Sequence, residues 1–427
     1  MSSRQRRSFL QLAAAMPAWT AGAGLAGLSS RVWAGPVTDT RFLLVFLRGG
    51  YDAMSLLVPA SSSFYKETRP NIAVPLASAG QTAGATRLNS PGQTAGATRL
   101  NSDWALHPAM DNSLLPLVQT GQARFIPFAG IDDPSRSHFE TQDAIELGQQ
   151  RGASRDFGSG FMNRLAMQLG ARNAIAFSSQ MPTCLRGQMA VANVSLKAAP
   201  PSARGGAAPL QEALKAMYQD TLLQARVAES FEVRSQVAQE MSAMTGEMEA
   251  ANRGAITAKG FELEARRIAR LMRERYALGF VDVGGWDTHI NQGAGTGYLA
   301  SRFEELGTGL AAFAAEIGPA TWRKTTVVVV SEFGRTAREN GNRGTDHGHG
   351  SVYWVLGGGL SAEQGVGPVV GEQVRIEAST LNQNRDLPVL NDYRSVLGGL
   401  FARQYGLSAK AIDSIFPGAK PQDLRLL

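Results

Sequence analysis

The sequence predicts an α/β fold in which helices flank a mainly parallel sheet. Three continuous apolar runs, at residues 42–47, 325–330 and 352–356, have the length of strands that are buried on both faces of a sheet. Helical stretches rich in Ala, Glu, Gln, Arg and Met lie between these runs, at about 210–254 and 261–278. Strands that alternate with helices are typical of a parallel sheet covered by helices.

The first element that the sequence predicts, in chain order, is an export signal. Residues 1–34 contain four arginines and no acid, an apolar stretch rich in Ala and Gly, and small residues near the end. Segment 6–11 (RRSFLQ) resembles the twin-arginine export motif. The apolar stretch is short and poor in Leu, which disfavours a permanent membrane anchor. No other stretch approaches the ~20 apolar residues that a membrane-spanning helix needs.

Without this predicted signal, the chain has a much smaller net charge. The whole chain has 42 Lys and Arg against 36 Asp and Glu, a formal charge of +6, and four of the positive charges lie in residues 1–34. Residues 35–427 are therefore nearly neutral, and we expect no nucleic-acid partner. We expect them to form a single domain with a helical insertion at about 210–278. The twin-arginine machinery is the expected export partner, and the expected location is the periplasm or the outside of the cell.

Carboxylates and imidazoles stand beside the predicted strands, in segments rich in glycine. In open α/β sheets, ligands bind at the carboxyl ends of the strands. Asp, Glu and His without thiolates suit zinc, manganese, magnesium or calcium, and the single cysteine, Cys184, excludes a cysteine-based metal site. The residues that we expect to hold metal are Asp52, Asp287, His289, Glu332, Asp346, His347 and His349.

Ser137 and His138 are the candidate catalytic residues. They open a predicted helix, and a hydroxyl at a helix N-terminus meets an anionic group with the help of the helix dipole. Ser137 is the candidate nucleophile, with Ser135 as the alternative. Two other interpretations stay open: Asp52 caps a helix, and His138 forms hydrogen bonds at a helix start without binding a ligand. We expect His107 to be structural.

Motifs along most of the chain resemble those of one family. They are FLRGGYD (46–52), LHP (106–108), SHFETQ (137–142), GWDTHINQ (285–292), SEFGR (331–335), GTDHGH (344–349) and DYRSV (392–396). They resemble motifs of the twin-arginine-exported bacterial proteins grouped as domain of unknown function family 1501 (DUF1501). This family is usually placed in the alkaline phosphatase-like, or sulfatase-like, superfamily. The resemblance implies an alkaline phosphatase-like core, metals at the carboxyl edge of its sheet, and a hydrolase ancestry.

The resemblance also implies roles for single residues. Asp52 matches the metal carboxylate that follows the first strand in the superfamily, and Asp287 with His289 matches its later Asp/His metal pair. The sulfatase signature Cys-x-Pro-x-Arg is absent, because Cys184 lies in the segment PTCLR. Where the superfamily commonly shows Asp-His-Gly, this chain has a Phe, Phe333, in the central position. Because Phe has no ligand atom, either one metal site lacks a ligand or a His at 347 or 349 supplies it.

The leading hypothesis is an exported, metal-dependent hydrolase of phosphate or sulfate esters that acts on a small anionic ester or a glycan. The ligand-rich strand ends and the resemblance both favour it. The alternative hypothesis is a non-catalytic periplasmic or cell-surface protein that keeps the hydrolase fold and binds a glycan or another partner. Phe333 and the unclear nucleophile favour this alternative. A twin-arginine redox protein is disfavoured, since residues 35–427 contain no flavin, haem or molybdenum motif.

Overall fold

A computed structural model of the chain describes residues 39–78, 96–150, 154–171, 173–195, 260–360 and 366–427, with a few residues between 216 and 227. These residues fall within one compact unit, Pro36–Leu427. The expected signal peptide at 1–34 lies outside the described residues, as does nearly all of the expected helical stretch at 210–254.

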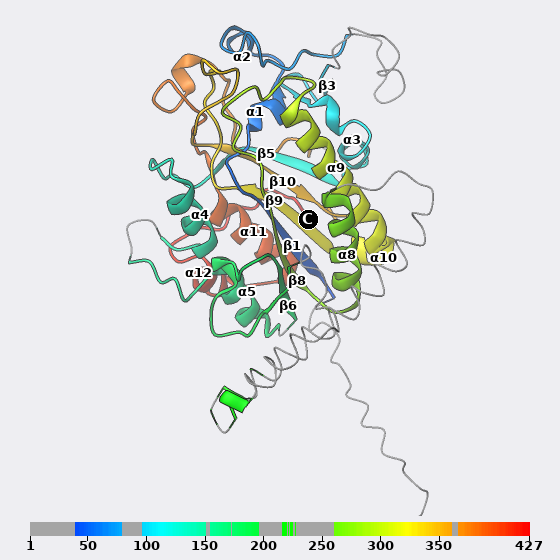
Figure 1. Cartoon of the computed structure of the whole chain (residues 1–427), viewed down its shortest axis with the longest axis vertical. Helices are drawn as coiled ribbons and strands as arrows, with labels where there is room; N and C mark the ends of the chain where they lie inside the picture. The colour runs from blue at the N-terminus through cyan, green and yellow to red at the C-terminus, as the bar shows by residue number, and fades with distance from the viewer. Residues whose placement is uncertain are drawn as a thin grey trace, which may run out of the picture. The chain divides into compact units, whose positions relative to one another are not determined.

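An eight-stranded sheet forms the centre of this unit (Figure 1). In spatial order its strands are β11 (Asn391–Asp392), β5 (Ala123–Gly130), β10 (Ser351–Leu356), β9 (Thr325–Ser331), β1 (Arg41–Leu47), β8 (Leu278–Val283), β6 (Ala174–Phe177) and β7 (Ala192–Asn193). A second sheet has three short strands, in the order β2 (Leu57–Pro59), β4 (Trp104–Leu106) and β3 (Thr98–Arg99). The three apolar runs predicted as strands are β1, β9 and β10, so these predictions are confirmed.

The large sheet is mostly parallel, as the sequence predicts. Strands β9, β1, β8, β6 and β7 are parallel to one another in this order, and β11 is parallel to β5. Strand β10 is antiparallel to both of its neighbours, β9 and β5. All residues of β10 are buried. Its apolar run therefore indicates that both faces of the strand are buried, but it does not indicate whether the strand is parallel or antiparallel.

Helices cover both faces of the sheet (Figure 1). The odd-numbered residues 43–47 of β1 pack into one hydrophobic core together with a first set of helices, which is named below. The even-numbered residues 42–46 pack into another core together with a second set. This alternation is the two-residue period of a strand. The first set includes α3 (Leu114–Gln119), α8 (Phe261–Glu274), α9 (Tyr298–Ile317) and α10 (Pro319–Trp322). The second includes α4 (His138–Leu147), α5 (Phe161–Leu169), α11 (Tyr393–Tyr405) and α12 (Ala409–Ile415).

The shorter helices lie in the connections. They are α1 (Ala53–Leu56), α2 (Ser63–Glu67) and the 3₁₀ helices η1 (Pro108–Met110), η2 (Thr183–Leu185) and η3 (Ala378–Thr380). The helix predicted at 261–278 ends earlier, at Glu274, because Leu278 already begins β8 and pairs with β1. None of the described helices is long and apolar enough to cross a membrane.

One edge of the large sheet collects segments from five strands. The parallel strands β1, β8 and β9 end at this edge, and β5 runs in the same direction because β10 is antiparallel to both β9 and β5. Helix α4, which follows β5, therefore starts near this edge, and the segment that precedes β10 also reaches it. Residues that are distant in sequence are in this way brought together at the edge where α/β sheets commonly bind ligands.

Candidate functional site

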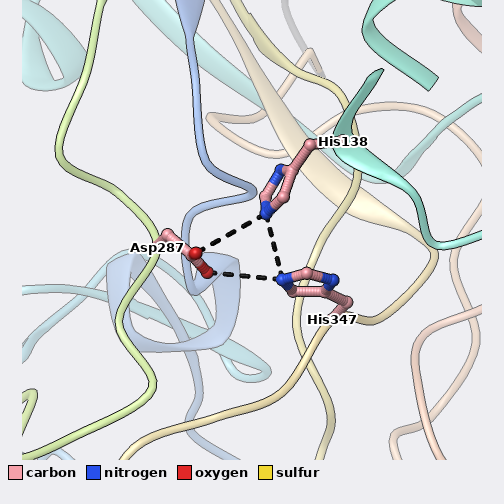
Figure 2. A group of neighbouring side chains, drawn as sticks. All are labelled: His138, Asp287 and His347. Atoms are coloured by element: carbon pink, nitrogen blue, oxygen red, sulfur yellow. Dashed lines mark hydrogen bonds and ion pairs between the residues drawn. The ribbon is translucent and has the colours of Figure 1, made fainter. Parts of the chain in front are cut away.

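Three side chains from distant parts of the sequence meet at this edge (Figure 2). His138 is the first residue of α4, Asp287 follows β8, and His347 precedes β10. One ligand atom of each residue lies within 4.8 Å of those of the other two. His138 Nε2 is 3.0 Å from His347 Nε2 and 3.7 Å from Asp287 Oδ2, and His347 Nε2 is 3.4 Å from Asp287 Oδ1. We name His138, Asp287 and His347 the ligand cluster.

His289 adjoins the ligand cluster as a fourth donor. Its Nε2 lies 2.9 Å from Asp287 Oδ1 and 3.2 Å from His347 Nε2. Two ligands of a tetrahedral zinc ion, each bonded at about 2.0–2.1 Å, lie roughly 3.3 Å apart. The separations within the ligand cluster, from 3.0 to 3.7 Å, are close to that value, so these three residues have the right size for one such ion, with His289 next to them.

The second ring nitrogen of each imidazole, Nδ1, faces an acceptor. The contacts are His138 Nδ1 to Glu332 Oε1 at 2.8 Å, His289 Nδ1 to Asp346 Oδ1 at 3.2 Å, and His347 Nδ1 to the backbone carbonyl of Arg136 at 3.0 Å. Because carboxylates and carbonyl oxygens accept hydrogen bonds, we assign a proton to each Nδ1. In the neutral rings each Nε2 then carries a lone pair that faces other lone pairs and a carboxylate.

Electron-pair donors that face one another are stabilised by a cation. The guanidinium of Arg335 contacts Asp287 and lies 3.4 Å from His289 Nε2, and a proton or a metal ion between the remaining donors would stabilise them further. Metal-binding histidines commonly donate their other N–H group to a carboxylate or to a backbone carbonyl. His138, His289 and His347 all have this arrangement. The donor set and its outer contacts therefore fit a divalent metal ion.

Glu332 is the buried anchor of His138. Its carboxylate accepts hydrogen bonds from His138 Nδ1, Gln142 Nε2 (2.9 Å), the backbone N–H of Gly49 (2.8 Å) and the Ser331 hydroxyl (2.9 Å). Burial raises the pKa of Glu332, but these hydrogen bonds outweigh burial, so its pKa lies below the usual range. The structure places Glu332 behind His138 as a hydrogen-bond acceptor and not within the ligand cluster.

Arg335 holds Asp287 in place. Its guanidinium is fully buried and donates hydrogen bonds to Asp287 and to backbone carbonyls of the turn that follows β1. Burial raises the pKa of Asp287, but the hydrogen bond and charge of Arg335 outweigh it, so this pKa lies below the usual range. Burial, and then the charges of His138 and Arg335, lower the pKa of His347. These shifts favour an ionised carboxylate and a neutral imidazole, the forms that bind metal.

Phe333 packs against two of these imidazoles. Its ring centroid lies 4.8 Å from that of His138 and 5.1 Å from that of His347. Phe333 therefore restricts both rings without offering a ligand atom. Of the two histidines that the sequence proposes in its place, His347 belongs to the ligand cluster. His349 is buried and has its Nε2 3.1 Å from Asp132 Oδ1.

Asp52 lies in a buried ion pair. Its carboxylate accepts hydrogen bonds from Arg69 at 2.6 and 3.0 Å, from the Ser55 hydroxyl at 2.7 Å and from Gln292 at 2.7 Å. Burial raises the pKa of Asp52, but the charge of Arg69 and these hydrogen bonds outweigh it, so the pKa lies below the usual range. Asp52 is also the N-cap residue of α1, although its side chain does not cap that helix. It is therefore not part of the candidate site.

The other predicted residues occupy several positions. Ser137 is the N-cap residue of α4, next to His138, and its half-buried side chain does not cap the helix. Ser135 Oγ lies 3.3 Å from the Thr141 hydroxyl and accepts a hydrogen bond from the backbone of Ser137. His107 is buried, with both ring nitrogens in contact with backbone atoms, which suits a structural role. The identity of the nucleophile stays a prediction.

A comparison with known protein families tests the resemblance that the motifs indicate. A family model described as "Protein of unknown function (DUF1501)" matches residues 39–416. The chain belongs to the DUF1501 family. The whole ligand cluster lies within the matched residues of this DUF1501 protein, from α4 to the segment before β10. No curated protein matches the chain.

Two residues of this DUF1501 protein position the site but are absent from the sequence-based assignment. Gln142 donates a hydrogen bond to Glu332, and Arg335 donates to Asp287. Both lie inside motifs that resemble those of the family, SHFETQ and SEFGR. They could have been selected from the sequence by their place in these motifs. The motif alone, however, does not reveal which carboxylate a Gln or an Arg contacts.

Proposed function

We propose that this DUF1501 protein is a metal-dependent hydrolase of phosphate or sulfate esters. A divalent ion would be held by His138, Asp287 and His347, with His289 as the fourth donor. The observation that carries the proposal is the convergence of imidazole Nε2 atoms on one carboxylate, while each Nδ1 is bound to an acceptor. Mixed nitrogen and oxygen donors suit zinc or manganese better than calcium, which prefers oxygen ligands.

The residues of the chain would prepare the site before a substrate arrives. Glu332 orients His138, and Arg335 keeps Asp287 ionised. Ser137 is the proposed nucleophile, because it directly precedes His138 and its hydroxyl is not used as a helix cap. A divalent ion at this place would supply Lewis-acid polarisation of a phosphoryl or sulfuryl oxygen.

We also propose an alkaline phosphatase-like core and export by the twin-arginine route to the periplasm or the outside of the cell. The mostly parallel sheet, with candidate ligands at its carboxyl edge, supports the first of these proposals. The segment RRSFLQ at 6–11 supports the second.

A panel of phosphate and sulfate monoesters tests the hydrolase proposal. The full chain, supplied with zinc or manganese, should hydrolyse at least one class of ester. Asp287→Ala should lower kcat/KM by about 10²–10³, because it removes a proposed ligand of the metal ion that would stabilise the developing negative charge. Asp423→Ala is a matched control, because Asp423 is similarly exposed (50% against 46%) and is also paired with an arginine. Activity that Asp287→Ala leaves unchanged would contradict the proposed site.

The position of Phe333 favours one second candidate, a metal-bearing binding protein without catalysis. A Phe stands where the resemblance places a metal ligand, and its ring packs against His138 and His347 without offering a ligand atom. If the wild-type chain binds metal but hydrolyses no ester of the panel, the binding function replaces the hydrolase.

A further inference from the structure

A polar pocket of about 250 Å³ lies along α4, beside the ligand cluster. Its walls come from α4, from the segment after β6 and from the turn after β1. The lining includes Arg48, Phe139, Gln142, Asp143, Ser178 and Arg186. We name this space the α4 pocket. Its volume is below the ~300–1,000 Å³ of pockets that enclose drug-sized ligands, so its occupant is a small group.

Gln142 connects the α4 pocket with the ligand cluster. It stands four residues after His138, so both side chains share one face of α4, about 6 Å apart along the helix axis. Its Nε2 donates to Glu332, the acceptor of His138, and its Oε1 accepts from Arg48 at 2.9 Å. The ligand cluster and the pocket are therefore neighbours along α4, about one helical turn apart.

The lining of the pocket is polar but has no surplus of positive charge. It contains two arginines and three carboxylates. Arg48 contacts two of these carboxylates, Glu146 at 2.9 Å and Asp282 at 2.8 Å. Such a lining does not favour a second anionic group. Serine, threonine and glutamine side chains in the lining both donate and accept hydrogen bonds, which complements an uncharged ligand rich in hydroxyl groups.

Phe139 adds an apolar surface to this polar lining. It directly follows His138 and is 84% exposed, although large aromatic side chains are usually buried. An exposed aromatic ring beside a polar pocket offers a flat surface for the C–H face of a sugar ring. Arg186 is also exposed, and its guanidinium has a long contact of 3.5 Å with the Met181 carbonyl. It is therefore available to donate to ligand hydroxyl groups.

We propose that the α4 pocket binds the sugar ring of a sugar phosphate or sugar sulfate whose ester group lies at the ligand cluster. Phe139 stacks on the ring, and Arg186 donates to its hydroxyl groups. This inference rests on the proposed function, since the ester group at the ligand cluster sets which end of the sugar enters the pocket.

Three kinds of probe separate the pocket from the ligand cluster in the full chain loaded with zinc. Inorganic phosphate reports on the cluster, and methyl glycosides of glucose, galactose and mannose report on the pocket. The corresponding hexose 6-phosphates report on both, and they are used with a methylene group in place of the ester oxygen so that the proposed activity cannot hydrolyse them. By titration calorimetry, at least one hexose 6-phosphate should bind about tenfold more tightly than phosphate, the scale of one good aromatic contact.

Single substitutions assign this advantage to the pocket. Phe139→Ala and Arg186→Ala should each remove most of it and leave the affinity for phosphate unchanged. Ile290→Ala is the control for Phe139, because Ile290 follows a site histidine, is 64% exposed and does not line the pocket. Arg323→Ala is the control for Arg186, since Arg323 is exposed near the opposite end of β9. Both controls should keep the advantage.

The possible results separate this inference from the proposed function. If phosphate binds but no hexose 6-phosphate binds more tightly, or if the advantage survives both pocket variants, the pocket assignment is wrong and the ligand cluster stands. If phosphate does not bind, the proposed function fails and the methyl glycosides decide the pocket alone. Saturation transfer from the protein to a methyl glycoside that disappears in Phe139→Ala then supports the pocket. Absence of transfer in the wild type overturns it.

Discussion

Each imidazole of the candidate site is fixed by a contact on the side away from its neighbours. His138 is held by the buried Glu332, His289 by the half-exposed Asp346, and His347 by a backbone carbonyl. Outer contacts of this kind orient metal-binding histidines and make them better ligands. We therefore predict that metal affinity depends on residues that hold the imidazoles without touching the metal.

Asp346→Asn should weaken metal binding by about 10–100-fold, the usual effect of losing such an outer contact. The charge that favours the Nδ1–H tautomer of His289 is lost, while the side chain keeps its size. Competition with a zinc chelator measures the affinity. Asp423→Asn, at a carboxylate of the same 50% exposure, is the control and should leave the affinity unchanged. Equal affinities in the wild type and Asp346→Asn would show that Asp346 does not support the site.

Asp52→Asn should destabilise the fold by about 3–5 kcal/mol, because it leaves the buried Arg69 without its counter-charge. The folded pKa of Asp52 lies below its unfolded value. Its stabilising contribution is therefore present above the unfolded pKa of about 3.9 and is lost as the pH falls through the folded pKa. Urea denaturation measures the change. The double variant Asp52→Leu/Arg69→Met should recover part of the loss.

The same variants test the sequence-based assignment of Asp52 as a metal ligand. The ion pair with Arg69 predicts that Asp52→Asn, when folded, keeps its metal content. Loss of the metal without loss of stability would return Asp52 to the site.

At the scale of elements, the site depends on how closely the segments after β1 and β8 approach each other. Gly49, in the turn after β1, has φ +124°, and a Cβ there would lie 2.7 Å from the backbone nitrogen of Asp287. Glycine meets both demands, since it adopts positive φ and has no Cβ. The turn and the ligand loop are therefore fitted to each other through backbone contact.

Gly49→Ala should lower both stability and metal affinity, because the loop that carries Asp287 must move. Gly121→Ala is the matched control, since Gly121 has φ +71° and no atom within 4 Å of the position that a Cβ would take. The control should cost about 1–2 kcal/mol from backbone strain alone and leave metal affinity unchanged. Thermal unfolding and chelator competition measure the two effects. If Gly49→Ala behaves like Gly121→Ala, close approach of the two loops is not needed.

The sequence predicts the long buried strands well but not the shorter elements between them. The apolar runs of β1, β9 and β10 are visible because both faces of each strand are buried. Strand β5 contains Pro127, which weakens a strand pattern, and the sequence pattern does not separate the start of β8 from the preceding helix. The reversed direction of β10 depends on its pairing with β5, which no local pattern reveals.

The candidate site, too, is only partly predictable from the sequence. The sequence indicates that Asp287, His289 and His347 belong at a ligand-binding edge, because polar residues beside strand ends carry that signal. It does not reveal that Asp52 pairs with Arg69, since that partner comes from an unrelated segment. It also assigns His138 to catalysis, whereas its Nε2 faces the other candidate ligands.

At the scale of the whole molecule, most of the formal charge of +6 belongs to the N-terminal segment. The arginines at 4, 6, 7 and 31 account for four of these charges. Without residues 1–34, the chain has little net charge to attract nucleic acid. The two arginines at 6 and 7 are the ones that match the export motif.

The double substitution Arg6→Lys/Arg7→Lys should abolish export, because the twin-arginine machinery reads this pair. Fractionation of bacterial cells that express the full chain measures the result, with the variant expected to stay in the cytoplasm. Arg4→Lys lies outside the pair and should be exported like the wild type. Export of the double variant, or export from cells without the twin-arginine machinery, would contradict the proposed route.

The metal content of the purified full chain tests the central claim most directly. After folding with zinc and manganese supplied, elemental analysis should find about one divalent ion per chain. His347→Gln should lose this ion, and His349→Gln should keep it, because His349 contacts Asp132 and lies outside the ligand cluster. Less than about a tenth of an equivalent in the wild type, or a full equivalent in His347→Gln, would contradict a metal site at the carboxyl edge of the sheet.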